Sequence, residues 1–360
     1  MEPLKNQYNQ TYIIRLGEAI SKVYPSFEKG DFVSNVIDRT WEEKELKERM
    51  RHISATLGEF LPKKYKESIE ILKKAAHQFD GFIAMFFPDF VEVYGKDELE
   101  ISLNALEYFT QFSSSEFAIR SFIIRYPKET MERMLVWSKH ENHHVRRLAS
   151  EGCRPRLPWA IALEDYKKDP TPVLQILENL KNDESEYVRR SVANNLNDIA
   201  KDNPDIVIAI GEKWIGNTME TNKLVKHACR TLLKNANPKA LKLFGFGDVD
   251  QIKINNLELS TCRLKIGEDL YFDFEMENQN MGDTKIRLEY GIDYVKANGK
   301  QNRKIFQIKE LSYQKGSFTI SRKQSFQNFS TRKHYAGKHA IAIIVNGQEL
   351  ATQEFDLIVN

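Results

Sequence analysis

The chain has 360 residues, of which 41% are hydrophobic and 29% are charged, and its formal net charge is +2. This length favours two domains, and so small a net charge does not by itself indicate a polyanionic partner. Three widely separated cysteines without a C-x-x-C pair argue against a disulfide framework or a zinc knuckle. The N-terminus has no signal segment and no apolar run could span a bilayer, so we expect a cytoplasmic monomer (bacterial cytosol) without a membrane partner.

The first 80 residues have the spacing of amphipathic helices. Apolar side chains recur at three- and four-residue intervals from Tyr12 to Ile20, and Pro25 ends that pattern. Asp31 is a candidate N-cap for the next helix, and Pro62 is expected to open another. Further helices are predicted over 99–109, 116–125, 129–139 (opened by Pro127), 204–214 and 224–233, with a short last helix after Pro238.

One pattern occurs twice within residues 141–198. Val145 and Val188 are each followed by two arginines and then by small and apolar residues, and the two copies are offset by 43 residues. Helical solenoids repeat with a period of roughly 40–47 residues, and Val225 marks a degraded third copy. Stacked helices of this kind present cations along a concave wall, which suits a nucleic-acid backbone.

The pattern changes near Gly245, where alternation of apolar and polar residues replaces helical spacing. Alternating runs occur at 252–254, 270–274, 286–290, 305–308, 318–320 and 339–345. Turn signals such as Asn298-Gly299 separate them, and about seven short strands are typical of an immunoglobulin-like sandwich. We therefore predict a helical solenoid over residues 1–247 followed by an immunoglobulin-like β-sandwich over 248–360.

Basic side chains are concentrated in the second domain. Between residues 300 and 340 there are ten of them, opposed by Glu310 alone. They are Lys300, Arg303, Lys304, Lys309, Lys315, Arg322, Lys323, Arg332, Lys333 and Lys338. A surface of one charge sign attracts a polyanion because condensed counterions are released on binding. The other interpretation is an ordinary solvated face of a globular domain.

The sequence offers no motif for a cofactor. No Walker A loop and no G-x-G-x-x-G loop are present, and no G-x-S-x-G supports a serine nucleophile. His143-His144 is the only adjacent histidine pair. We expect neither a cofactor nor a metal ion.

One segment combines a carboxylate with arginines and an aromatic residue. Glu151 stands directly before Gly152 and is followed by two arginines, two prolines and Trp159. Gly152 and the two prolines are expected to bend the chain sharply, which would move Glu151 and Trp159 out of regular packing. The structural alternative is a helix end closed by Gly152, with Glu151 paired to an arginine and Trp159 in the core. Glu116, near a helix start, and Asp198, late in a helix, are further candidate carboxylates or else ordinary helix residues.

The segments 146–159 and 188–198 carry a resemblance. Their sequences, RRLASEGCRPRLPW and RRSVANNLND after Val188, resemble those of the bacterial alkylpurine DNA glycosylases of the AlkC/AlkD superfamily. The likeness is strong over residues 114–215 and weaker in the N-terminal helices. It implies a solenoid of HEAT-like repeats, and the immunoglobulin-like domain points to the AlkC branch.

The resemblance implies a monofunctional DNA glycosylase of base-excision repair. Such an enzyme removes cationic N-alkylated bases, chiefly 3-methyladenine, from double-stranded DNA by hydrolysis. Carboxylates in a preformed site stabilise the oxocarbenium-like sugar and position water. The preference between 3-methyladenine, 3-methylcytosine and 7-methylguanine stays open, as does the choice between a flipped base and a kinked duplex.

By its motifs, the resemblance also assigns residues. Glu151 is the first candidate for the catalytic carboxylate, Glu116 and Asp198 are supporting carboxylates, and Trp159 stacks on base or sugar. The three carboxylates are expected to converge on one solvent-reachable pocket beside Trp159. The implied DNA-binding residues are Arg147, Arg154, Arg156, Arg190 and Asn194.

Two other functions fit parts of the sequence. A HEAT-repeat scaffold that binds a protein would also use stacked charged helices. A protein that binds damaged DNA without cleaving it would keep the basic wall. The segment from Glu151 to Trp159 distinguishes the enzyme from the scaffold, because a scaffold has no need of a carboxylate among arginines beside an exposed tryptophan.

Overall fold

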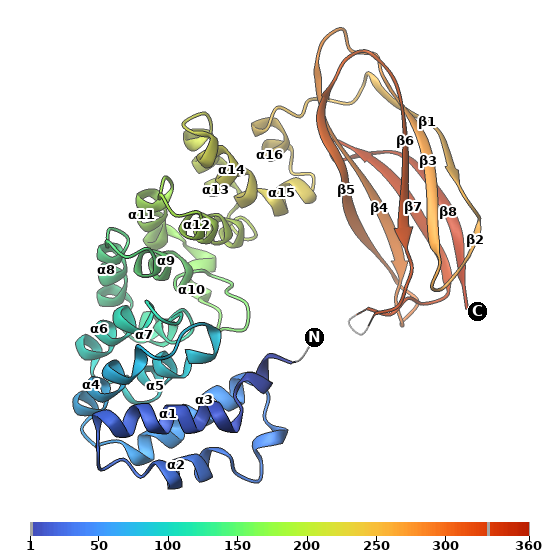
Figure 1. Cartoon of the computed structure of the whole chain (residues 1–360). Helices are drawn as coiled ribbons and strands as arrows, with labels where there is room; N and C mark the ends of the chain where they lie inside the picture. Colours follow the sequence, from blue (N-terminus) through green and yellow to red (C-terminus); the bar gives the residue numbers. More distant parts are fainter. Residues whose placement is uncertain (1–2, 330–331, 360) are drawn as a thin grey trace. The chain divides into compact units, whose positions relative to one another are not determined.

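The computed structural model describes residues 3–329 and 332–359 (Figure 1). The chain divides into two compact units. The first spans Met1–Val207 and Trp214–Ala228, and the second spans Ile208–Lys213 and Cys229–Asn360. Among the described residues, no helix is both long and apolar enough to cross a membrane.

The first unit consists of helices joined by short turns. They are α1 (Gln10–Val23), α2 (Lys29–Val36), α3 (Leu46–Phe60), α4 (Tyr65–Ala76), α5 (Phe86–Tyr94), α6 (Leu99–Phe109), α7 (Ile119–Arg125), α8 (Pro127–Trp137), α9 (His143–Glu151), α10 (Glu164–Lys168), α11 (Thr171–Leu180), α12 (Glu186–Ile199) and α14 (Met219–Ala228). Short 3-10 turns cover Leu4–Gln7, Trp41–Glu43 and Phe82–Ala84. Helix α13 (Pro204–Trp214) contributes residues to both units.

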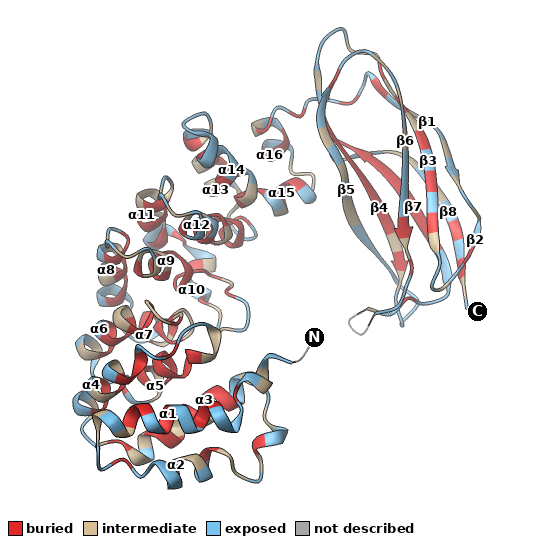
Figure 2. Ribbon diagram, viewed as in Figure 1, coloured by how far each residue is buried: buried red, intermediate tan, exposed pale blue. Residues whose placement is uncertain are grey.

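The helices of the first unit stack in two layers. Figure 1 shows α4, α6, α8 and α11 following one another in one layer, and α5, α7, α9 and α12 in the other. The repeated sequence pattern lies on α9 and α12, where Val145 and Val188 are completely buried. Helix α12 packs against both α9 and α14, and buried residues line the faces where neighbouring helices meet (Figure 2). The predicted HEAT-like solenoid is confirmed.

Several helix ends agree with the sequence, and others do not. The predicted ends of α6 and α13 are confirmed, as is Pro127 as the residue that opens α8, whereas α8 ends at Trp137 instead of 139. Asp31 is not an N-cap, because α2 begins at Lys29 and Asp31 lies in its first turn. The single helix predicted over 224–233 is wrong, since α14 and α15 (Arg230–Lys234) are separated at the buried Cys229.

The second unit contains α15, α16 (Pro238–Leu243) and two sheets. The strands are β1 (Ile252–Leu259), β2 (Arg263–Lys265), β3 (Asp269–Asn278), β4 (Thr284–Val295), β5 (Gln301–Tyr313), β6 (Gly316–Ser325), β7 (Gly337–Val345) and β8 (Gln348–Ile358). One sheet has the order β1-β3-β6 and the other β2-β8-β7-β4-β5. All neighbours are antiparallel except β2 and β8, which are parallel.

The two sheets enclose one apolar core. Alternate residues of β3, among them Leu270, Phe272 and Phe274, are buried in it. The immunoglobulin-like sandwich is confirmed, with eight strands in the described residues where about seven were predicted. Helix gives way to strand between Leu243 and Ile252, whereas the compact units divide at Ala228, so α15 and α16 belong with the sandwich.

Candidate functional site

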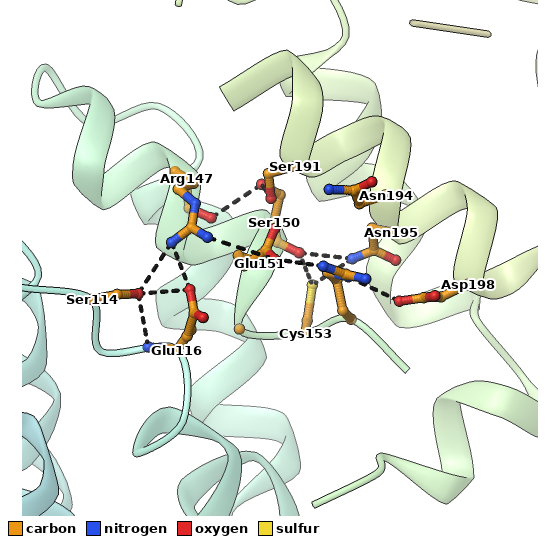
Figure 3. Close-up of polar contacts among 12 residues, drawn as sticks. Ser114, Glu116, Arg147, Ser150, Glu151, Cys153, Ser191, Asn194, Asn195 and Asp198 are labelled. Atoms are coloured by element: carbon orange, nitrogen blue, oxygen red, sulfur yellow. Dashed lines mark hydrogen bonds and ion pairs between the residues drawn. The ribbon is translucent and has the colours of Figure 1, made fainter. Parts of the chain in front are cut away.

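Three segments of the first unit bring charged side chains together (Figure 3). Glu116 lies shortly before α7, Arg147 and Glu151 lie on α9, and Asp198 lies in the last turn of α12. Arg154 lies in the loop that leads from α9 to α10. The stacking of successive repeats therefore assembles residues that are far apart in the sequence.

The five side chains form an array of alternating charge. Arg147 Nη1 donates to Glu116 Oε2 at 2.6 Å, and Arg147 Nη2 lies 3.6 Å from Glu151 Oε1. Arg154 Nη1 donates to the same oxygen of Glu151 at 2.6 Å, while its Nε donates to Asp198 Oδ2 at 2.8 Å. Each arginine thus bridges two carboxylates, and all three predicted carboxylates belong to one connected array.

Most of this array is shielded from solvent. Glu151 is 5% exposed, Arg154 7% and Asp198 2%. Burial alone would lower the pKa of Arg154, but the carboxylates of Glu151 and Asp198 outweigh it and raise that pKa. For Arg147, too, burial lowers the pKa, but the carboxylates of Glu116 and Glu151 outweigh burial and raise it. The charges are therefore held in place by one another, because a buried charge is stable only when it is paired.

Helix α12 fixes the backbone around Glu151. Asn195 Nδ2 donates to the Ser150 carbonyl at 2.8 Å, and Ser150 Oγ donates to Ser191 Oγ at 2.7 Å (Figure 3). Burial raises the pKa of the neighbouring Cys153 to about 12, so this thiol is neutral and unreactive at physiological pH. The sequence did not single out these contacts, since short polar residues in a helix give no signal of a partner.

Glu116 opens onto a cavity of about 380 Å³. The cavity is also lined by Phe82, Arg147 and Tyr187. The guanidinium carbon of Arg147 lies 4.6 Å from the Tyr187 ring centroid. Burial raises the pKa of Tyr187, partly offset by Arg147, so the ring is a neutral wall of the cavity. Phe82 and Tyr187 were not predicted, because single aromatic residues in helical segments read as core.

The expected convergence of three carboxylates on one pocket is only partly met. Glu116 lines the 380 Å³ cavity, whereas Glu151 and Asp198 do not line it and are buried. Arg147 and Arg154 pair with Glu151, and Arg154 and Lys201 pair with Asp198, so cations cover both carboxylates.

Trp159 is exposed and has an unusual backbone. Its exposed fraction is 67%, and its φ is +64°, in the left-handed region that costs a bulky residue roughly 1–3 kcal/mol. The ring meets Phe82 edge-on, with centroids 6.1 Å apart, and the carbonyl accepts a hydrogen bond from Lys47 Nζ at 2.6 Å. Of the structural alternative, the helix end at Gly152 and the pairing of Glu151 with arginines are confirmed, and only the placement of Trp159 in the core is wrong.

Arg120 anchors the loop that carries Arg154 and Trp159. This completely buried arginine of α7 donates to the carbonyls of Gly152 (3.1 Å), Arg154 (2.7 Å) and Ile161 (2.6 Å). Burial lowers its pKa to about 10, so it remains a cation at physiological pH. Arg120 was not predicted, although an arginine within an apolar helical segment is a sequence signal for a buried, paired cation.

Comparison with known proteins places the chain in a family. A family model described as DNA alkylation repair enzyme matches residues 95–234, and one described as the C-terminal immunoglobulin-like domain of YhaZ matches 253–359. The chain is 44% identical to the uncharacterized protein YhaZ of Bacillus subtilis (strain 168), over 99% of this chain and all of that protein. A solved structure of Pseudomonas fluorescens alkylpurine DNA glycosylase AlkC, bound to DNA with an abasic-site analogue, covers 99% of this chain and all of its own at 37% identity, with a TM-score of 0.95. The chain belongs to the AlkC family.

The arginines expected to bind DNA have different environments within this family member. Arg190 projects from α12, its side chain is 64% exposed, and it pairs with Glu186 at 2.9 Å. Together with Lys223 it lines a cavity of about 210 Å³ between α12 and α14. The environment of Arg190 suits a phosphate, whereas the buried Arg154 is committed to two carboxylates.

The remaining predicted DNA-binding residues are also paired. Arg156 makes a bidentate pair with Asp202, with Nη2 at 2.7 and 2.9 Å from the two carboxylate oxygens. Asn194 Oδ1 lies 3.0 Å from His227 Nε2. The Arg156 side chain is nevertheless 36% exposed, so its guanidinium remains accessible to solvent.

Residues 140–144 read His-Glu-Asn-His-His, which has the H-E-x-x-H spacing of zinc proteases, and our expectation of no metal site overlooked it. That spacing places both histidines on one helix face only if a single helix spans it. Here α9 begins at His143 with Asn142 as its N-cap, and the Asn142 amide donates to His140 Nδ1. No group of three or more metal-ligating side chains occurs among residues 3–329 and 332–359.

Proposed function

We propose that the protein is a DNA glycosylase that hydrolyses the N-glycosidic bond of cationic N-alkylated bases, chiefly 3-methyladenine, in double-stranded DNA. The observation that carries the proposal is the array of Glu116, Glu151 and Asp198 bridged by two arginines. The exposed Trp159 follows on the loop after α9, and its ring meets Phe82, which lines the same cavity as Glu116. The likeness to an AlkC structure that contains abasic DNA supports the same activity. In this proposal the enzyme acts as a monomer, without a cofactor or metal ion, in the bacterial cytosol.

The chemistry follows from the charge of the lesion. An alkylated ring nitrogen makes the base a cation, so its glycosidic bond is weak and the departing base needs little protonation. The reaction then depends on stabilising a cationic sugar and on supplying water. Carboxylates that are already oriented do this without reorganising during the reaction.

Glu151 is the proposed carboxylate for the sugar cation. Both of its arginine contacts are made through Oε1, so Oε2 is the atom proposed to face the sugar and to accept a proton from water. Glu116, which lines the cavity, and Asp198, which positions Arg154, are the supporting carboxylates. The exposed indole of Trp159 is proposed to stack on sugar or base, where cation–π attraction favours a positive partner.

DNA binding is assigned to surface cations of both units. In the first unit these are Arg190 and Arg156. Arg147 and the uncharged amide of Asn194 are proposed to contact the DNA nearer the lesion. In the second unit, Arg303, Lys323 and Lys338 of the basic stretch are engaged in ion pairs. The other exposed cations of that stretch, such as Lys309 on β5, are proposed to contact phosphates.

Release of free base from methylated DNA tests the proposal. We expect the wild type to release 3-methyladenine and Glu151→Gln to release it on the order of 100-fold more slowly, with unchanged DNA affinity. Glu132→Gln, which removes an exposed carboxylate from α8, is the matched control and should behave as wild type. Wild-type excision by Glu151→Gln would contradict the assignment, and the relative release of 3-methylcytosine and 7-methylguanine would establish the lesion preference.

A second candidate is a protein that binds alkylated DNA without excising the base. The burial of Glu151 and Asp198 favours it, because buried carboxylates paired with arginines also serve as structural ion pairs. The same assay separates the two candidates. Binding of methylated DNA with no release of any base by the wild type would establish the second.

A further inference from the structure

The loop between α9 and α10 is hydrogen-bonded both near its ends and at its tip. Arg120 binds carbonyls near both of its ends, as described above. The tip of the loop is held separately, by Lys47 of α3, whose Nζ donates to the Trp159 carbonyl at 2.6 Å across 112 residues of sequence. Within the described residues this is the one hydrogen bond that Trp159 makes.

Lys47 also contacts the aromatic residues around Trp159. Its Nζ lies 5.0 Å from the centroid of the Phe117 ring. Phe117 meets Phe82 edge-on at 6.5 Å, and Phe82 meets Trp159 edge-on at 6.1 Å. The Lys47 ammonium group therefore contacts both ends of this aromatic row. It donates a charge-assisted hydrogen bond to the Trp159 carbonyl and makes a cation–π contact with Phe117.

The Trp159 peptide needs such a restraint. Its φ of +64° is disfavoured for a large side chain, and its indole is 67% exposed, so little packing opposes relaxation of the backbone. Without Lys47, the loop tip could adopt ordinary backbone angles while Arg120 still held the loop ends. The Trp159 indole would then point in a different direction.

We propose that Lys47 is a positioning residue for base excision, acting through Trp159. Its ammonium group fixes the left-handed Trp159 peptide and so holds the indole in place before DNA binds. Lys47 itself touches neither base nor sugar in this proposal. The inference rests on the proposed function only for its effect on the reaction rate.

The first test uses fluorescence of the free, full-length protein. The other three tryptophans, Trp41, Trp137 and Trp214, are at most 2% exposed, so Trp159 is the exposed emitter. Lys47→Met should increase the amplitude of nanosecond depolarisation from Trp159 by about twofold, with Trp159→Phe giving the contribution of the buried indoles. Lys47→Arg keeps a donor and should restore the restraint. Unchanged depolarisation in Lys47→Met would overturn the proposal.

A matched control separates the restraint from a loss of charge. Lys96 lines the same cavity of about 520 Å³ as Lys47, but it makes no bond to Trp159. Lys96→Met should therefore leave both the depolarisation and the rate of excision at wild-type values. An equal effect of both lysines would reassign Lys47 to the general charge of this surface.

The second test is kinetic. Lys47→Met should slow single-turnover release of 3-methyladenine on the order of tenfold, while DNA affinity and its salt dependence stay unchanged. In a Trp159→Ala background the same substitution should cause no further loss, because Lys47 acts through Trp159. A salt slope lowered by about one would identify Lys47 as a phosphate contact and overturn the proposal. If the wild type releases no base, the proposed function fails, and the depolarisation still decides whether Lys47 restrains Trp159.

Discussion

The Nε atom of Arg154 donates to Oδ2 of Asp198 at 2.8 Å, and this bond ties the loop after α9 to the last turn of α12. The same guanidinium holds Glu151 through Nη1 at 2.6 Å. Arg154 therefore organises two carboxylates from inside the protein. This position differs from that of a surface residue that exchanges counterions for a phosphate.

Replacing Arg154 should affect stability more than the salt dependence of binding. Arg154→Ala removes the nearest cation from the buried Glu151 and Asp198 and leaves them only Arg147 at 3.6 Å and Lys201 at 3.0 Å, so we expect the free energy of unfolding to fall by about 3 kcal/mol and excision to be lost. Arg154→Lys keeps the charge but not both contacts, and it should be intermediate. Denaturant unfolding and DNA titrations at several salt concentrations measure these effects. Full stability with a lowered salt slope would instead support the phosphate contact that the resemblance implied.

Gly152 is needed for close packing at the end of α9. Its backbone is ordinary and right-handed, but a Cβ there would meet Ile119 Cγ2 at 2.6 Å and the Leu148 carbonyl at 2.9 Å. Gly152→Ala should lower the free energy of unfolding by about 1–3 kcal/mol and slow excision, because it displaces Glu151. Gly30→Ala in α2 has no atom within 4 Å of the new methyl and should be neutral or stabilising. Equal thermal stability of the two variants would disprove the packing argument.

Adjacent arginines on α12 should respond differently to truncation. Arg190 is exposed and available to DNA, so Arg190→Ala should lower the salt slope of binding by about one without changing the melting temperature. Arg189 Nη1 donates to the carbonyls of Asp183 (2.6 Å) and Glu184 (2.9 Å), so Arg189→Ala should chiefly reduce stability. Titrations over a range of salt, combined with thermal melts, compare the pair. A salt slope changed by Arg189→Ala alone would reverse the assignment.

The second unit should lose stability in acid through His334. Burial, followed by Arg332, His339 and Lys304, lowers the pKa of His334 to about 4. The unfolded chain, with a pKa near 6.5, then binds more protons than the folded one between these values. The contribution of the neutral His334 to the free energy of unfolding is complete above pH 6.5. It is lost as the pH falls towards 4, and the loss is about 3 kcal/mol at most. Denaturant unfolding of wild type and His334→Gln at pH 7 and pH 4.5 measures it, and parallel pH dependences would exclude His334 as the cause.

Much of the fold could be predicted because the chain marks its elements locally. Pro204 at the first turn of α13 sets where that helix starts, and the paired arginines after Val145 and Val188 mark equivalent helices. Strand β2 was missed because it has three residues and one buried side chain, Leu264. Strand β8 was missed because only two of its eleven residues are fully buried, so alternation is weak.

The candidate site was predictable only for residues whose neighbours in sequence are informative. Glu151 and Trp159 stand in one unusual segment, and the sequence left open whether each faces the core. The partners of Lys47 and Arg120 could not be predicted, because both side chains bind backbone carbonyls far along the chain and a carbonyl has no sequence signature. The positive φ of Trp159 likewise depends on tertiary contacts, since local preference alone would avoid it.

The charged array also has a mechanical consequence. Ion pairs that run from Glu116 through α9 to Asp198 link the segment before α7, helix α9 and helix α12 of the first unit. In repeat proteins generally, the superhelix can change its curvature, because each repeat contacts only its neighbours. Here any change of curvature would separate opposite charges inside the protein, so the three carboxylates keep their alignment only while the curvature of these repeats stays the same.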